Sequence, residues 1–169
     1  MALTTKLNRF LAVALLAMAG LCASSAAAQA TPKSSDDAKV THLLEGCGHQ
    51  YKTYNTKDGP VWSIEELHGA SLKNVRILLA TNGGVMVMGV VVAEKAHMKV
   101  TAEFMHKLLR LTHDLDRVKI GFDNDEDLFV RIESPVRLLD AQDFKAQIDQ
   151  VVAAADEVYK QTSSFITAQ

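Results

Sequence analysis

The spacing of apolar residues predicts two amphipathic helices in the second half of the chain. The first is expected over residues 101–111. Its apolar stripe contains Phe104, Leu108 and Leu111 and is widened by Met105 and Leu109. The second follows Asp140, which is placed to cap the first turn. Its apolar face contains Phe144, Ile148, Val151, Ala155 and Val158.

An alternation of apolar and polar residues between these helices predicts a β-hairpin. Its strands are residues 118–122 and 128–133, and the polar segment 123–127 connects them. The apolar face consists of Val118, Ile120, Phe122, Leu128, Val130 and Ile132. The other face carries Lys119, Arg131 and Glu133. We therefore expect a sheet with one solvated side at this hairpin.

An earlier hairpin is apolar on both faces. Residues 75–81 and 85–93 have the strongest strand character in the chain, and Asn82-Gly83-Gly84 has the chemistry of a tight turn. One face would pack under the helices, so the other needs a different cover. We assign to this second face Leu78, Ala80, Met86, Met88, Val90 and Val92.

Two covers are open for that second face. The first helix or the tail after Ser163 could fold across it, or a second protein chain could bind there as a dimer or client. Met86 and Met88 suit a binding surface, because flexible thioethers adapt to varied partners. Our hypothesis is that the six residues form a protein interface.

The region before this hairpin contains a helix and extended chain. Val40, Leu43 and Leu44 predict a helix of about three turns over residues 36–46. Residues 51–67 are either one broken strand or a strand preceded by a small hairpin arm. The order helix, three strands, helix, two strands, helix predicts an α+β fold. Its antiparallel sheet has about five strands, with helices packed mainly on one face.

The first 30 residues have the composition of a secretory signal peptide. Lys6 and Arg9 precede an apolar run over residues 10–21, and small residues lead to cleavage positions after Ala28 or Ala30. The run of 12 residues is shorter than the roughly 20 that span a bilayer. We expect a single mature domain, residues 31–169, that is periplasmic or secreted and has no stable membrane insertion.

Charge and cysteine content argue against nucleic-acid binding and against an internal disulfide. The mature chain would have 16 basic and 20 acidic residues, a net charge of −4 that gives no support for nucleic-acid binding. Cys22 belongs to the signal segment, so Cys47 is alone and no internal disulfide is possible. Packing must therefore stabilise the domain.

No set of residues has the spacing of a catalytic, cofactor or metal site. Cys47 precedes Gly48-His49, but a lone Cys at a helix end is typical of a packing residue or an intermolecular disulfide, so no catalytic role is expected. The six histidines show no close metal-binding pair. His106 and His113 are seven residues apart, and we expect the helix to end between them.

The acidic run 123–127 is similar to the start of a calcium loop, with Asp123, Asp125 and Asp127 at alternate positions. Leu128 stands where that loop needs glycine, and Ser134 where it needs a bidentate glutamate. The run is therefore predicted to be a solvated hairpin tip without useful calcium affinity.

Four segments carry a resemblance to a known family. They are LLRL at 108–111, VKIGFD at 118–123, LLDA at 138–141 and AAADE at 153–157. Through them the mature chain resembles the bacterial YbjN-like domain, which is linked to sensory-transduction regulation and is similar in fold to class I type III secretion chaperones. The resemblance implies binding of client segments without chemistry, commonly by a homodimer, and supplies no catalytic motif.

These observations predict an exported, non-enzymatic domain that binds protein in a chaperone-like or regulatory role, with no cofactor. The alternative is a small-ligand sensor that binds in a cleft between helices and sheet. A cleft with convergent polar groups would favour the sensor, and a flat apolar sheet face would favour protein binding.

Overall fold

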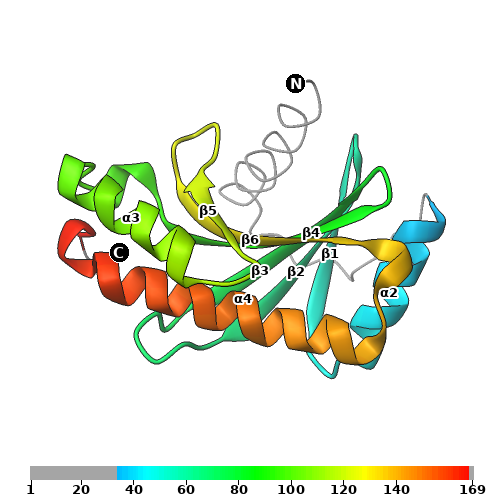
Figure 1. Ribbon diagram of the computed structural model, residues 1–169. Coiled ribbons are helices and arrows are strands. Elements are labelled where there is room, and N and C mark those ends of the chain that lie inside the picture. The colour runs from blue at the N-terminus through cyan, green and yellow to red at the C-terminus, as the bar shows by residue number, and fades with distance from the viewer. Residues whose placement is uncertain (1–33, 168–169) are drawn as a thin grey trace.

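The computed structural model describes residues 34–167, which form one six-stranded sheet and three α-helices (Figure 1). The helices are α2 (Ser35–Gly46), α3 (Ala102–Asp114) and α4 (Ala141–Thr162). The strands are β1 (Tyr51–Thr56), β2 (Gly59–Leu67), β3 (Val75–Asn82), β4 (Val85–Ala93), β5 (Lys119–Phe122) and β6 (Leu128–Pro135). The predicted α+β class is confirmed, with one strand more than expected. The signal segment and its cleavage positions lie outside the described residues.

The sheet has the order β1-β2-β3-β4-β6-β5, and every neighbouring pair is antiparallel. The additional strand comes from residues 51–67, where Thr56 pairs with Gly59 across a short turn. Of the two alternatives for this region, the hairpin arm is therefore the right one. At the next hairpin, Gly83 and Gly84 both have positive φ, as the tight turn requires.

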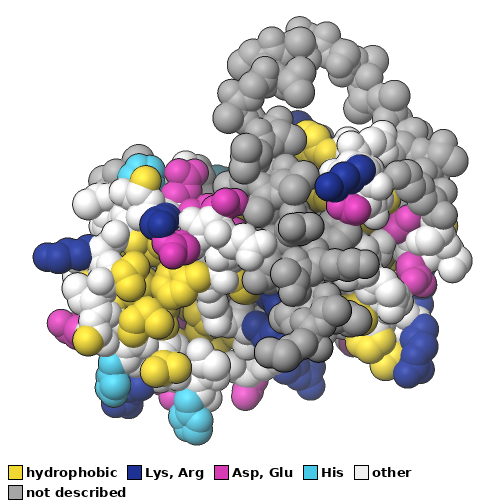
Figure 2. Space-filling model, turned by 90° about the horizontal axis from the view of Figure 1, so that it is seen from above, with side chains coloured by type: hydrophobic (Ala, Val, Ile, Leu, Met, Phe, Trp, Pro, Cys, Tyr) yellow, Lys and Arg dark blue, Asp and Glu magenta, His cyan; other side chains and the backbone are white. Residues whose placement is uncertain are grey.

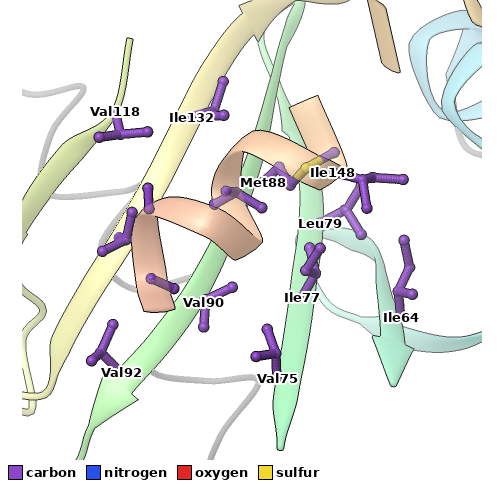
Figure 3. Close-up of a cluster of buried hydrophobic side chains, with 14 of the residues drawn as sticks. Ile64, Val75, Ile77, Leu79, Met88, Val90, Val92, Val118, Ile132 and Ile148 are labelled. Carbon is purple, nitrogen blue, oxygen red and sulfur yellow. The ribbon is translucent and has the colours of Figure 1, made fainter. Parts of the chain in front are cut away.

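One face of the sheet lies under the helices, and the main core is there. In Figure 1, α4 runs along the sheet with α3 near one end and α2 near the other. The Asp140 side chain accepts a hydrogen bond from the Asp143 N–H (2.8 Å), which confirms the predicted cap of α4. Residues of all three helices join one buried cluster with the strand side chains that face them, including Ile77, Met88 and Val90 (Figure 3).

Helix α3 is longer than predicted, and its buried apolar stripe is narrower. Phe104, Leu108 and Leu111 are buried, but the side chains of Met105 and Leu109 are 38% and 69% exposed. The expectation that these two widen the buried stripe is wrong, because α3 packs along one edge only, near β5 and α4. The helix also continues to Asp114, so it does not end between His106 and His113 as expected.

The prediction that six hairpin residues share one face is wrong. The two-residue turn pairs Asn82 with Val85, so even-numbered residues of β3 stand opposite odd-numbered residues of β4. Leu79 therefore pairs with Met88, while Ala80 pairs with Val87. Met86, Met88, Val90 and Val92 belong to the main core, whereas Leu78 and Ala80 lie on the opposite face with Val61.

Internal cover of the opposite face by the first helix or the tail is also wrong for the described residues. In α2, Val40, Leu43 and Leu44 pack in the main core, between the helices and the sheet. In the tail, Phe165 packs on Phe104 with ring centroids 5.5 Å apart, and Ile166 pairs with Met98. Both segments are thus on the helix side.

Candidate functional site

The sheet face turned away from α2, α3 and α4 is the candidate site, and we call it the helix-free face. No helix of residues 34–167 packs on it (Figure 1). Strand register places these side chains on it: Lys52 and Tyr54 from β1, Val61, Ser63 and Glu65 from β2, Arg76, Leu78 and Ala80 from β3, Val87 and Val91 from β4, Phe129, Arg131 and Glu133 from β6, and Lys119 from β5. Figure 2 looks onto this side of the molecule.

The centre of the helix-free face is apolar. Val61, Leu78 and Ala80 form a second buried cluster, separate from the main core. Val87 and Phe129 are also buried, at 2% and 6% exposure. The centre of this face is therefore composed like a protein interior and not like the solvated side of a sheet.

Phe129 and Arg131 extend this surface across β6. The Arg131 guanidinium stacks on the Phe129 ring at 4.9 Å from the centroid. The neighbouring strands make room with glycine: a side chain at Gly121 would contact the Phe129 ring, and one at Gly89 would lie 3.2 Å from Arg131 Cβ. Phe129 and Val87 were not predicted as residues of this face. A two-residue turn pairs even-numbered residues of β3 with odd-numbered residues of β4, so the turn alone would have placed Val87 on the same face as Ala80.

Two clusters of charge flank the apolar centre, and each has one glutamate between two cations. Glu65 accepts from Lys52 Nζ at 2.5 Å and lies 3.7 Å from Arg76 Nε. The hydrogen bond and the charge of Glu65 raise the pKa of Lys52, which keeps that amine protonated.

At the other end of the sheet, Glu133 lies 2.5 Å from Lys119 Nζ and 2.9 Å from an Arg131 guanidinium nitrogen. The predicted solvated side of this hairpin is thus charged, but Arg131 is buried. We call the two clusters the Glu65 cluster and the Glu133 cluster. Each carries a formal charge of +1.

The acidic run 123–127 is not a fully solvated tip, because Asp123 and Asp127 are buried. Asp123 Oδ1 accepts from the N–H groups of Asp125 (3.0 Å) and Asp127 (2.9 Å), which closes the loop. Asp127 Oδ1 accepts from the Lys95 N–H at 2.8 Å. The two carboxylates therefore organise the chain locally. Burial raises the pKa of Asp123, and the hydrogen bonds from Asp127 and Asp125 only partly offset this.

A hollow of about 380 Å³ between α4 and the β2–β3 loop is the candidate small-ligand cleft. Its polar side chains include His68 and Asp156. Asp156 Oδ1 accepts from the N–H groups of Ser71 (2.6 Å) and Leu72 (2.7 Å), and His68 hydrogen-bonds with the Lys73 carbonyl. Burial alone would raise the pKa of Asp156, but these N–H groups outweigh it and lower the pKa. The Asp156 and His68 side chains therefore hydrogen-bond to the β2–β3 loop itself, which makes them less suited to bind a ligand in this hollow.

The remaining candidates do not assemble a reactive centre within residues 34–167. Cys47 is partly buried against the core, and its Sγ donates to the Leu44 carbonyl at 3.1 Å, at the end of α2. His106 and His113 lie on the same helix, beside a shallow surface hollow with Leu109 and Arg110. Among the described residues, no three His, Cys, Asp or Glu side chains are grouped to hold a metal ion.

Comparison with known proteins adds no assignment. Neither a protein-family model nor a curated protein matches the chain. Within the described part of the chain, no helix is both long enough and apolar enough to cross a membrane.

Proposed function

We propose that this protein is an exported, non-enzymatic domain that binds another protein chain through the helix-free face. The apolar centre of Val61, Leu78, Ala80 and Val87 carries the proposal, since none of the described helices packs on it. Apolar area at the centre with charge at the rim is the usual composition of protein interfaces. The predicted signal peptide supports a periplasmic or secreted site of action.

The resemblance to YbjN-like domains supports the same function, because the secretion chaperones of similar fold bind client segments without chemistry. The arrangement of the charged groups on the face also favours protein binding over catalysis. Glu65 and Glu133 are paired with neighbouring cations in two separate clusters, whereas an active site would converge such groups in one hollow.

Photo-crosslinking from within the helix-free face tests this function. We expect a photoreactive phenylalanine at Val87 to form an adduct with a protein chain when the full chain is expressed and exported in its native host. The same probe at Leu109 should give none, since that side chain is exposed on α3, away from the face. An adduct between two copies would identify a homodimer.

Equal labelling from Val87 and Leu109, or no protein adduct from Val87 in a variant that folds and is exported, would contradict the proposal. Each adduct should be identified by mass and re-formed from the two purified proteins. That binary reconstitution separates a specific partner from chance neighbours.

A further inference from the structure

The helix-free face has a charge opposite to that of the whole chain. Among residues 34–167 it holds four cations, Lys52, Arg76, Lys119 and Arg131, and two carboxylates, Glu65 and Glu133. Its formal charge is therefore +2, whereas the chain has a net charge of −2. The surplus is divided between the two ends, because the Glu65 cluster and the Glu133 cluster each carry +1.

We propose, on the basis of the protein-binding function above, that the partner segment is acidic as well as apolar. Its apolar side chains would pack on the central surface, and its carboxylates would bind the cations at either end. The side chains of Lys52, Arg76 and Lys119 are 62%, 50% and 59% exposed, so their charge is felt at the surface. Each glutamate is already shared by two cations, so an incoming carboxylate meets a net positive charge.

The same charges favour this partner over the other occupants. Two copies of the face would each bring +2 into one interface, which is unfavourable for a face-to-face homodimer. Nucleic acid and anionic membranes present phosphate at high density, and a net charge of +2 is small for neutralising many phosphates. The apolar centre also offers no contact to a phosphate backbone.

A set of peptides matched in apolar content tests this inference. Peptides of about ten residues, the length of a long strand, would alternate Val or Leu with Glu, Lys or Ser. Their binding is measured by fluorescence anisotropy to the protein expressed as the full chain and purified as the host exports it. We expect the Glu peptide to bind about tenfold or more tightly than the Lys or Ser peptide, with an advantage that shrinks at high salt.

Charge reversal on the protein gives the matched controls. Arg76→Glu with Lys119→Glu changes the face from +2 to −2 and should reverse the preference between the Glu and Lys peptides. Arg110→Glu with Lys145→Glu makes the same change in total charge at exposed positions of α3 and α4, and should leave the preference unchanged. A preference that follows total charge in both variants would overturn the inference.

The outcomes also separate this inference from the proposed function. If Ser and Glu peptides bind equally, the face selects apolar surface alone, so the acidic partner is wrong and protein binding stands. Tighter binding of an oligonucleotide or of anionic vesicles than of the Glu peptide overturns the inference, as does a homodimer crosslinked through Val87. If neither peptides nor crosslinks report a protein contact at the face, both proposals fail.

Discussion

Met88→Lys is expected to leave the protein unfolded, whereas Val87→Lys is expected to leave it folded. The two residues are neighbours in β4 but point to opposite faces of the sheet. Met88 is completely buried beneath α4, in the cluster that contains Ile148 (Figure 3). Lysine there would lose the apolar burial and place an unpaired charge in the core, a loss of about 4 kcal/mol or more.

The lysine at position 87 would stand on the helix-free face, directly opposite Glu133. Val87 is itself only 2% exposed, so lysine would lose apolar burial there too, but its ammonium can pair with Glu133, and we expect a smaller loss of about 2 kcal/mol or less. Urea denaturation of the two exported variants measures the difference. Equal destabilisation by both substitutions would show that the helix-free face is an internal core surface, and the proposed function would then be wrong.

Asp156→Ala is expected to lower the free energy of unfolding by about 2 to 3 kcal/mol at neutral pH, or roughly 5 to 10 °C in Tm. The Asp156 carboxylate, on α4, accepts two short hydrogen bonds from the N–H groups of Ser71 and Leu72. It links α4 to this loop, and it approaches Gly69 so closely that no side chain fits there. Without it these partly buried N–H groups lose their acceptor.

The pH dependence of this effect has a definite sign. The pKa of Asp156 is lowered by folding from its ordinary value of 3.8, so its contribution is complete above that value and is lost as pH falls through the folded pKa. The difference in stability between the parent and Asp156→Ala should therefore be largest near neutral pH and shrink below about pH 4. A difference that grows in acid would contradict the assigned role.

Asp123→Asn is the matched control, with the opposite sign. The pKa of Asp123 is raised by folding, so its ionised form is less stable in the folded protein, and that penalty appears as pH rises through the folded pKa. Asparagine keeps an oxygen for the Asp125 and Asp127 N–H groups and removes the buried charge. Thermal melts at pH 7 should show an equal or higher Tm for Asp123→Asn and a lower Tm for Asp156→Ala.

Local patterns were sufficient to predict most of the fold. The cap at Asp140 depends on a residue three positions along the chain, and the strands of the 118–133 region show their buried face by alternation. The 51–67 region was ambiguous, because a short turn and a break in one strand have similar composition. In the structure β1 and β2 pair with each other, and β2 also pairs with β3, so the region is a hairpin within a larger sheet.

The candidate site was harder to predict, because it depends on contacts between distant elements. Assigning a face to β4 requires the register across the turn, and an error of one residue moved Met88 from the core to the surface. The Glu65 cluster joins three strands, and Asp156 holds a loop 84 and 85 residues away in the sequence. No short pattern contains such pairs, whereas the loop made by Asp123 is local and follows the usual behaviour of Asp in turns.

Methyl NMR of the exported protein during titration with the Glu peptide tests the central claim most directly, since it locates the contact. The claim is that protein binds on the helix-free face. We expect chemical-shift changes at the methyl groups of Val61, Leu78 and Val87, while Val90 in the core and Leu109 on α3 are unchanged. Changes centred on Leu109 or on the hollow beside His68, or no change at any methyl group, would contradict the claim.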